Sequence, residues 1–112
     1  MLVAVYGTLK QGRSNHGLMR DSVLLGKTRL NGFIMYSAGG FPVIYRNVGE
    51  TISIEVYEVS PEVVKHNLDP LEGHPHWYKR EQVETEVGLA WLYIMQGDQY
   101  RVENRQIISG EF

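Results

Sequence analysis

Segments with the pattern of β-strands recur from one end of the chain to the other, and this pattern limits the possible folds more than any other feature. Residues 2–6 (LVAVY) form a short apolar run that ends at a glycine, as expected for a strand buried on both faces. Residues 51–59 alternate between two faces, and residues 89–95 (LAWLYIM) are apolar throughout. Residues 82–87 also alternate, and Gly88 separates them from that apolar run, which predicts a hairpin. We therefore expect a domain dominated by sheet.

The stretch between residues 24 and 46 carries shorter apolar runs interrupted by glycines and one proline. The runs are residues 24–25, 33–36 and 41–45, and the interrupting residues are Gly26, Gly32, Gly39, Gly40 and Pro42. We interpret the runs as strands joined by tight turns, because glycine and proline commonly interrupt regular structure. Many closely spaced strands with few helices favour a small barrel or a curled sheet.

Only two segments carry helix signals. Residues 60–62 (Ser-Pro-Glu) make a good helix start, because the serine can cap the helix, the proline suits its first turn and the glutamate favours its positive end. Pro70 disfavours helical geometry at the preceding residue, so we expect this helix to end or tighten at Asp69 and residues 71–73 to form a turn. Residues 15–20 are long enough for one turn or two.

Length and composition predict one folded domain. A chain of 112 residues can bury a core without disulfides or metal, so residues 1–112 are expected to form a single domain. Apolar residues make up 43% of the chain and charged residues 21%, as in ordinary soluble globular proteins. The chain has no cysteine, which excludes a thiol nucleophile, a disulfide framework and a thiolate metal site.

Charge and hydropathy narrow the class of partner. The net charge of -2 and the pI near 6.1 argue against a dedicated nucleic-acid binder, because no basic excess is present to displace counterions from phosphates. No apolar run approaches the length of a membrane span, about 18 residues, and no basic leader precedes the first apolar run. We therefore expect a cytoplasmic protein that binds neither nucleic acid nor membrane. The sequence carries no signature of an oligomeric state.

Residues 7–14 (GTLKQGRS) are one substitution from the phosphate-binding pattern G-x-x-x-x-G-K-[ST], with Arg13 in place of the lysine. A phosphate loop needs a helix of several turns after it, and Asn15 and Gly17 make a poor start for one. A nucleotide site is therefore not favoured. Two other interpretations stay open: the glycines permit turns with positive φ, or the N–H groups after the first strand bind an anion such as a carboxylate.

Three motifs follow one another along the chain: VYGTLKQGRSNH near the N-terminus, IEVYEVS in the middle and LDPLEGHPHWYKR at residues 68–80. Together with AWLYIM and the closing SGEF, they resemble the γ-glutamylcyclotransferase-like family, particularly its small γ-glutamylamine cyclotransferase branch. The match spans nearly the whole chain, and the pairing of Tyr-Gly-Thr-Leu with L-D-x-x-E-G-x-P-x-x-Y-x-R makes it specific. The resemblance implies an α+β fold, a small mixed β-barrel with a few short helices.

The resemblance also implies a ligand site between the loop of Tyr6, Gly7, Thr8 and Leu9 and a single catalytic glutamate, Glu72. N–H groups of the loop would hold either the α-carboxylate of the substrate or the oxyanion on its γ-carbonyl, and both assignments stay open. Apolar and aromatic neighbours in sequence predict that the pKa of Glu72 is raised towards the working pH. The plain alternative is a solvated carboxylate just past a helix end.

Residues around these motifs receive supporting roles. Tyr6 either contacts the ligand or packs in the core with its hydroxyl satisfied. Tyr78 matches the aromatic residue that follows the catalytic turn in the family, and it is expected to wall the pocket. Arg80 is expected to pair with a carboxylate, and Asp69 to be a turn or capping residue without a catalytic role. His16 can tie the loop down by a hydrogen bond.

The histidines do not favour a metal site. His74 and His76 form an H-x-H pair, with His66 and Glu72 near in sequence, but the loop offers no clear third ligand for zinc. A serine hydrolase is not favoured either, because no G-x-S-x-G motif occurs.

One residue departs from the family pattern. Ile54 stands where many relatives carry glycine before Glu-Val-Tyr, and we expect it to reshape the floor of the pocket. Lys10 and Arg13 are expected to face solvent or to order the loop.

The chemistry that the family implies needs neither cofactor nor metal. A γ-glutamyl compound contains its own nucleophile, because its α-amine can attack its γ-carbonyl and close a lactam, which releases 5-oxoproline. One carboxylate can take and return the proton, and Glu72 is the candidate. The expected partner is a small molecule, a γ-glutamyl amine or small γ-glutamyl peptide. The alternative function is a non-catalytic small-ligand binding or interaction module on the same fold, which the departure at Ile54 and the short chain suggest.

Overall fold

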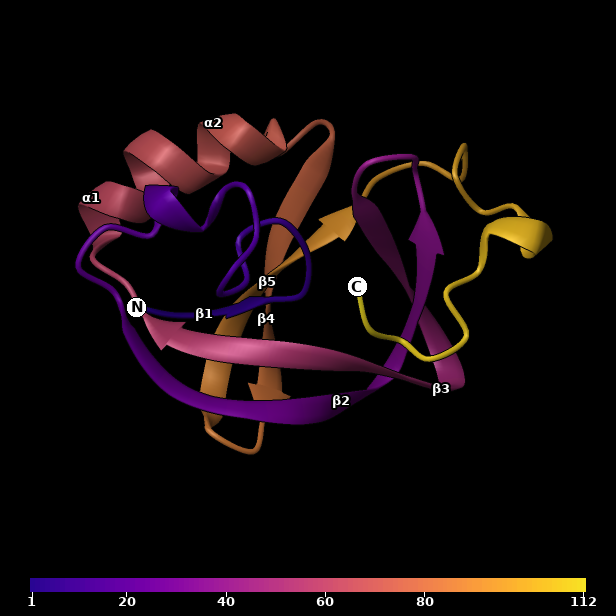
Figure 1. Cartoon of the computed structure of the whole chain (residues 1–112), viewed down its shortest axis with the longest axis horizontal. Helices are drawn as coiled ribbons and strands as arrows, with labels where there is room; N and C mark the ends of the chain where they lie inside the picture. The colour runs from indigo at the N-terminus through magenta and orange to yellow at the C-terminus, as the bar shows by residue number, and fades with distance from the viewer.

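The computed structural model describes residues 1–112 and contains one five-stranded sheet (Figure 1). β1 lies at the centre of the sheet; it runs parallel to β5, and every other neighbouring pair of strands is antiparallel. The sheet is therefore mixed. In order across the sheet, the strands are β2 (Val23–Ser37), β3 (Pro42–Glu58), β1 (Leu2–Val5), β5 (Gly88–Met95) and β4 (Tyr78–Thr85).

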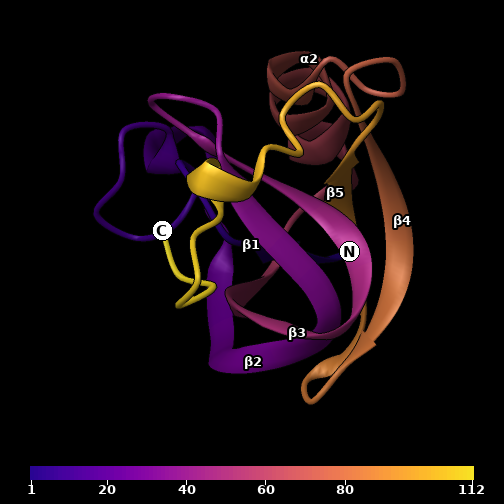
Figure 2. The same cartoon turned by 90° about the vertical axis from the view of Figure 1, so that its right-hand side faces the viewer.

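The fold class is α+β, as predicted, but the sheet is not closed into a barrel. β2 and β4 are its two edges and do not pair with each other. The sheet curls strongly, as Figure 2 shows, and the Thr28 hydroxyl on β2 donates to Glu86 Oε2, in the turn after β4, at 2.8 Å. A closed barrel needs main-chain hydrogen bonds between its first and last strands. Here the two edges meet through side chains, so the sheet stays open.

β2 and β3 form one long hairpin rather than several short strands. The pairing register shifts next to Gly26 and next to Gly32, so both glycines lie at irregularities inside β2. Gly32 has a φ of 90°, which glycine adopts without strain, and only residues 38–41 form the turn. The prediction of tight turns at Gly26 and Gly32 was wrong, because glycine can mark a β-bulge within a strand as well as a turn.

One helical stretch runs without a break from Pro61 to Glu72. The Ser60 hydroxyl caps its start by accepting a hydrogen bond from the Val63 N–H at 3.2 Å, as predicted. The stretch comprises α1 (Pro61–Val63), the π-helical turn η2 (Val64–Leu68) and α2 (Asp69–Glu72).

This helix continues through Pro70, contrary to the prediction. The Asp69 N–H donates to the carbonyl of Val64, five residues back, as in a π-helix. A wider turn accommodates a proline whose ring and missing N–H would interrupt a regular α-helix. The helix ends at Glu72, and Gly73 closes it in the left-handed conformation with a φ of 61°. Glu72 is therefore a helical residue and not part of an irregular turn.

Apolar side chains pack on both faces of β1. Val3 and Val5 join one buried cluster, and Ala4 joins the other, because successive side chains of a strand point to opposite faces. Val64 and Leu68 of the helical stretch belong to the cluster of Val3 and Val5, so the helix covers that face of the sheet (Figure 1).

Two 3₁₀ turns complete the secondary structure. η1 (His16–Leu18) is the single turn expected within residues 15–20, and η3 (Glu103–Arg105) lies near the C-terminus. None of the helical segments has the length and apolar composition needed to cross a membrane.

Candidate active site

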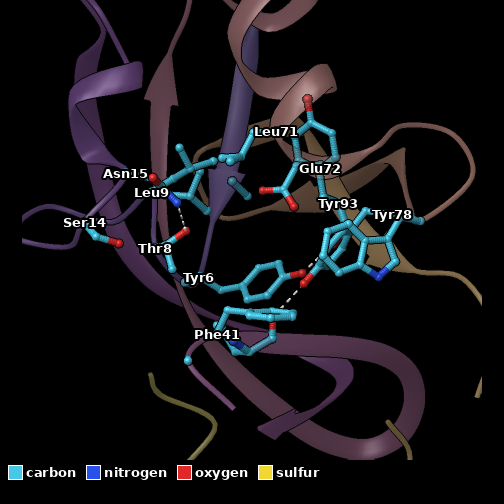
Figure 3. Close-up of a pocket in the computed structure, with 16 residues that line it drawn as sticks. Tyr6, Thr8, Leu9, Ser14, Asn15, Phe41, Leu71, Glu72, Tyr78 and Tyr93 are labelled. Carbon is cyan, nitrogen blue, oxygen red and sulfur yellow. Dashed lines mark hydrogen bonds between the residues drawn. The ribbon is translucent and has the colours of Figure 1, made fainter. Parts of the chain in front are cut away.

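A pocket of about 300 Å³ opens at the end of β1, between the loop that follows this strand and the C-terminal end of the helix (Figure 3). The turn between β2 and β3 forms a third side. A concave site of this size can enclose a small molecule. The pocket is lined by 16 residues: Ala4, Val5, Tyr6, Gly7, Thr8, Leu9, Ser14, Asn15, Gly40, Phe41, Pro42, Leu71, Glu72, Trp77, Tyr78 and Tyr93.

The structure brings all of the sequence-predicted site residues to this one pocket. Figure 3 shows the Glu72 carboxyl group directed into it, with Thr8 and Leu9 on the opposite side. Glu72 ends the helix, whereas Thr8 lies in the loop after β1, so residues 64 positions apart in the chain (72 − 8) line one pocket. The predicted residues that line it are Tyr6, Gly7, Thr8, Leu9, Glu72 and Tyr78.

Glu72 carries the only carboxyl group among the lining residues. The carboxyl group is largely buried and has neither a hydrogen-bond donor nor a cationic partner in the protein. Burial disfavours its charged form and raises its pKa from 4.5 to about 7. A carboxyl group with this pKa exchanges its proton near neutral pH, as a general acid and base must. The raised pKa agrees with the expectation from its apolar and aromatic neighbours.

The loop after β1 presents main-chain donors that the chain itself does not use. The N–H groups of Gly7, Thr8 and Leu9 have no acceptor in the structure, although Gly7 and Leu9 are buried. Buried amides are nearly always hydrogen-bonded in proteins. Three successive free donors beside a pocket therefore indicate a place for an acceptor from a ligand, such as a carboxylate or an oxyanion.

Residues at the start of η1 hold this loop in place. Asn15 Nδ2 donates to Thr8 Oγ1 at 2.9 Å, and the Asn15 N–H donates to the Thr8 carbonyl at 2.9 Å. His16 Nδ1 donates to the Leu9 carbonyl at 2.9 Å, which is the hydrogen bond expected of His16. The free donors of the loop are thus held in position before a ligand arrives.

Gly7 is required by close packing rather than by its φ. A Cβ atom at this position would lie 2.7 Å from Pro42 Cγ and 2.9 Å from Pro42 Cδ, closer than carbon atoms pack. Only Gly12 of the two loop glycines has a positive φ, 82°. The loop leads into the single 3₁₀ turn η1, so the long helix of a phosphate loop is absent.

The two tyrosines of the predicted site form walls. The Tyr6 hydroxyl donates to the Tyr93 carbonyl at 2.7 Å, and the Tyr78 hydroxyl donates to the Pro42 carbonyl at 3.0 Å. Burial raises the pKa of both hydroxyls above its usual value, so both stay protonated at neutral pH. Tyr6 thus packs with its hydroxyl satisfied while its ring lines the pocket, and Tyr78 walls the pocket as expected.

Asp69 anchors the end of the helix one turn before Glu72. Its Oδ1 accepts from the Tyr93 hydroxyl at 2.6 Å and from Arg80 Nε at 3.0 Å. The Arg80 guanidinium also lies over the Trp91 ring, 4.5 Å from its centroid. Arg80 therefore has the carboxylate partner expected of it, and Asp69 joins the helix to β4 and β5 instead of forming a turn.

Sequence reasoning missed the side of the pocket formed by the turn between β2 and β3. Residues 39–42 (Gly-Gly-Phe-Pro) predicted a turn, but nothing in the sequence showed where that turn would lie. The long hairpin carries Phe41 and Pro42 to the pocket. Trp77, one of the aromatic residues close to Glu72 in sequence, also lines the pocket.

The expectation for Ile54 was wrong, and of the two alternatives for Lys10 the loop-ordering one is confirmed. Ile54 does not line the pocket: it is 2% exposed and packs in the cluster that contains Ala4, so it does not shape the pocket floor. Lys10 does not face solvent: it is 8% exposed, and its Nζ donates to the Phe112 main-chain oxygen at 2.8 Å. The Arg13 guanidinium lies 4.9 Å from the centroid of the Phe112 ring. Lys10 and Arg13 therefore order the loop against the C-terminal segment.

The histidines of the H-x-H pair do not gather other ligands. His74 Nδ1 accepts a hydrogen bond from the Arg80 N–H at 3.2 Å, and His66 Nε2 lies 3.3 Å from Glu62 Oε2. Nowhere does the structure group three His, Asp or Glu side chains that could hold a metal ion.

Comparisons with known proteins agree on one family. The family model described as gamma-glutamyl cyclotransferase, AIG2-like, matches residues 3–112. A protein of Vibrio cholerae, named provisionally as a gamma-glutamylcyclotransferase, is 38% identical over 96 residues, which cover 85% of this chain and 82% of that protein. A protein of Niallia circulans named gamma-L-glutamyl-butirosin B gamma-glutamyl cyclotransferase is 31% identical over 107 residues, which cover 86% of this chain and 67% of that protein.

A solved structure shares the fold along the whole chain. The crystal structure of an uncharacterized protein of Pyrococcus horikoshii superposes with a TM-score of 0.85 and 28% sequence identity. The superposition covers 100% of this chain and 89% of that one.

Proposed function

The chain belongs to the gamma-glutamyl cyclotransferase, AIG2-like family, and we propose that it releases 5-oxoproline from a γ-glutamyl amine or a small γ-glutamyl peptide. The family and the names of the relatives indicate activity of the gamma-glutamylcyclotransferase type. The amine-releasing reaction and the roles of individual residues are our proposal. We also propose that residues 1–112 form one cytoplasmic domain and that the reaction needs no cofactor.

One arrangement carries the proposal: a proton carrier faces an anion site across a small pocket. The Glu72 carboxyl group has no partner in the protein and a pKa of about 7. Gly7, Thr8 and Leu9, whose N–H groups are free, line the same pocket, and Figure 3 shows Thr8 and Leu9 opposite Glu72. A substrate that cyclises on itself needs these two elements and no covalent nucleophile.

The first half of the reaction forms the new ring bond. Ionised Glu72 takes a proton from the α-ammonium of the bound substrate, and the freed amine attacks the γ-carbonyl carbon. The carbonyl oxygen becomes an oxyanion as the new carbon–nitrogen bond forms. The loop N–H groups donate to this oxyanion or to the α-carboxylate, and fixed donors of this kind stabilise a transition state by several kcal/mol.

The second half of the reaction expels the leaving amine. The oxyanion returns to a carbonyl, the bond to the leaving nitrogen breaks, and the Glu72 carboxyl group gives its proton to that nitrogen. The new ring nitrogen, which was the α-amine, loses a second proton, and this proton reaches the departing amine through solvent. The products are 5-oxoproline and an ammonium ion, and no water is consumed.

Holding the substrate in a folded conformation is the remaining contribution of the pocket. Intramolecular reactions in well-oriented systems reach effective molarities of about 10⁵ M or more. The buried rings of Tyr6 and Tyr78 and the tied loop restrict the space in which the γ-glutamyl chain can move. The walls therefore favour the cyclising conformer without taking part in proton transfer.

A panel of γ-glutamyl compounds tests the proposal. The purified protein is incubated with γ-glutamyl amino acids, γ-glutamyl-ε-lysine and simple γ-glutamyl alkylamides, and 5-oxoproline is measured by mass spectrometry. We expect product from at least one amide, loss of product in Glu72→Gln, and unchanged product in Glu84→Gln, an exposed glutamate on β4. Full activity in Glu72→Gln would contradict the proposal. Binding without product across the panel would favour the non-catalytic module instead.

A further inference from the structure

The mouth of the pocket carries an aromatic pair that the proposed reaction does not use. Phe41 and Trp77 meet edge to face, with ring centroids 5.7 Å apart and an interplanar angle of 80°. Trp77 is 40% exposed, whereas the tyrosine walls deeper in the pocket are buried. Tyr100 also contacts Phe41 edge to face, with ring centroids 6.2 Å apart. A half-exposed tryptophan at the edge of a pocket is a surface that an apolar group can cover.

The pair lies next to the position that the leaving group must take. Glu72 has to reach the leaving nitrogen to protonate it, so the substituent on this nitrogen begins beside Glu72. A Cβ atom on Gly73 would lie 3.0 Å from Trp77 Cβ, so Trp77 packs directly against the residue that follows Glu72. Phe41 enters the same space from the turn between β2 and β3 (Figure 3).

The charges of the lining residues favour an apolar leaving group over a negatively charged one. No lysine, arginine or histidine is among the lining residues, and Glu72 is the only acid. The polar head of a γ-glutamyl compound uses the loop N–H groups and Glu72, which leaves aromatic surface for the rest of the molecule. A negatively charged leaving group would find no cation there, whereas an apolar one would bury its surface against two rings.

We propose that Phe41 and Trp77 form a subsite for the leaving amine, and that this subsite selects amines with an apolar, ring-bearing substituent. This inference rests on the proposed function. Contact between aromatic rings adds to the burial of apolar area, so the preference for a ring over a methyl group is about tenfold or more in kcat/KM. Trp77 and Phe41 act as specificity residues and move no proton.

Matched substrates test the subsite. Turnover of γ-glutamyl-benzylamide and γ-glutamyl-methylamide is followed by release of 5-oxoproline. We expect kcat/KM to be at least about tenfold higher for the benzylamide, and Trp77→Ala to lower kcat/KM for the benzylamide by a clearly larger factor than for the methylamide, which removes most of this preference. Trp77→Phe should keep most of the preference. Leu89→Ala, an exposed apolar residue away from the pocket, should change neither substrate.

A binding measurement separates this inference from the proposed function. Glutaric acid monobenzylamide and monomethylamide lack the α-amine and cannot cyclise, so calorimetry reports their binding without turnover. We expect the benzylamide to bind about tenfold more tightly to the wild-type protein, and Phe41→Ala and Trp77→Ala each to reduce that ratio. Equal affinities, or equal losses for both ligands in both variants, would overturn the subsite. Absence of 5-oxoproline together with a persisting binding ratio would overturn the reaction and keep the subsite.

Discussion

Two sides of the pocket, the loop after β1 and the C-terminal end of the helix, differ in which of their polar groups the protein itself hydrogen-bonds. In the loop after β1, the carbonyls of Thr8 and Leu9 are tied by Asn15 and His16, while the N–H groups of the same residues are free. At the helix end, the backbone of Glu72 is fixed by the helix and by Gly73, while its carboxyl group has no partner at all. The loop side, which we call the loop wall, therefore offers fixed main-chain donors. The helix side, which we call the helix wall, offers one carboxyl group that can gain or lose a proton.

Under the proposed function, this difference assigns binding to the loop and proton transfer to the helix end. Main-chain N–H groups do not titrate, so the loop can hold an anion at any physiological pH. A carboxyl group responds to its surroundings, and burial alone moves the pKa of Glu72 to about 7. Changes on the loop wall should therefore alter binding, and changes on the helix wall should alter the chemical step.

The largest expected effect tests the helix wall. Glu72→Gln keeps the shape of the side chain and removes the proton carrier, so we expect kcat to fall by about a thousandfold. Steady-state kinetics on the best substrate of the panel measure this loss, and calorimetry with glutaric acid monomethylamide should show affinity within about twofold of wild type. A raised KM with unchanged kcat would assign Glu72 to binding and remove the contrast between the walls.

The next effect concerns the packing that supports the loop wall. Gly7→Ala places a Cβ atom 2.7 Å from Pro42 Cγ, so either the loop or the turn must move. We expect a loss of about 1–3 kcal/mol in the free energy of unfolding, measured with urea, and a rise in KM of tenfold or more. Gly17→Ala is the matched control, because a Cβ atom there would have no neighbour within 4 Å. Equal stability of the two variants would show that the loop does not depend on this contact.

The pH dependence of stability tests the helix wall again. The pKa of Glu72 is about 7 in the folded protein and 4.5 in a free side chain, so the folded state binds this proton more tightly. The stability that this tighter proton binding contributes is fully present below pH 4.5 and is lost as the pH rises through 7. Glu72→Gln should therefore be more stable than wild type by about 2 kcal/mol at pH 8 and should lose this advantage at pH 4. Urea unfolding at both pH values measures it, and a constant difference would contradict the burial of this carboxyl group.

The smallest effect loosens the loop wall without removing a donor. Asn15→Ala deletes the hydrogen bond from Asn15 Nδ2 to Thr8 Oγ1 but leaves the main-chain bond between the two residues. A single neutral hydrogen bond contributes about 1 kcal/mol, so we expect KM to rise about fivefold with a smaller change in kcat. Asn31→Ala, an exposed residue on β2, is the control. A loss confined to kcat would place Asn15 with the chemical step.

Local patterns predicted much of the fold. The first strand, the interior strand at residues 89–95, the hairpin before it and the Ser60 cap all appear where the sequence indicated. Each depends on interactions between residues a few positions apart. One error arose where a distant contact outweighed a local signal: the glycines of β2 lie at irregularities inside a strand because β3 pairs with β2 on both sides of them. The other error was local, because a π turn lets the helix pass through Pro70.

The candidate site, like the fold, was predicted where short sequence motifs sufficed and missed where distant residues meet. The motifs around Gly7 and Glu72 marked the residues that line the pocket, and the neighbours of Glu72 in sequence predicted the direction of its pKa. The third side of the pocket was not predictable, because Phe41 and Pro42 lie about thirty residues from either motif. The error at Ile54 has the same cause, since its strand turns that side chain into the core.

The sequence by itself determined the strand-rich α+β character and the loop that follows the first strand, and it made Glu72 the candidate acid, because periodicity, caps and short motifs are encoded over a few residues. Only the tertiary structure decided that the sheet stays open, that the three N–H groups of the loop have no acceptor, and that the Glu72 carboxyl group enters the pocket opposite Thr8 and Leu9 (Figure 3). Those properties depend on which distant segments exclude water and supply partners, and burial and hydrogen-bond satisfaction are set by the whole fold.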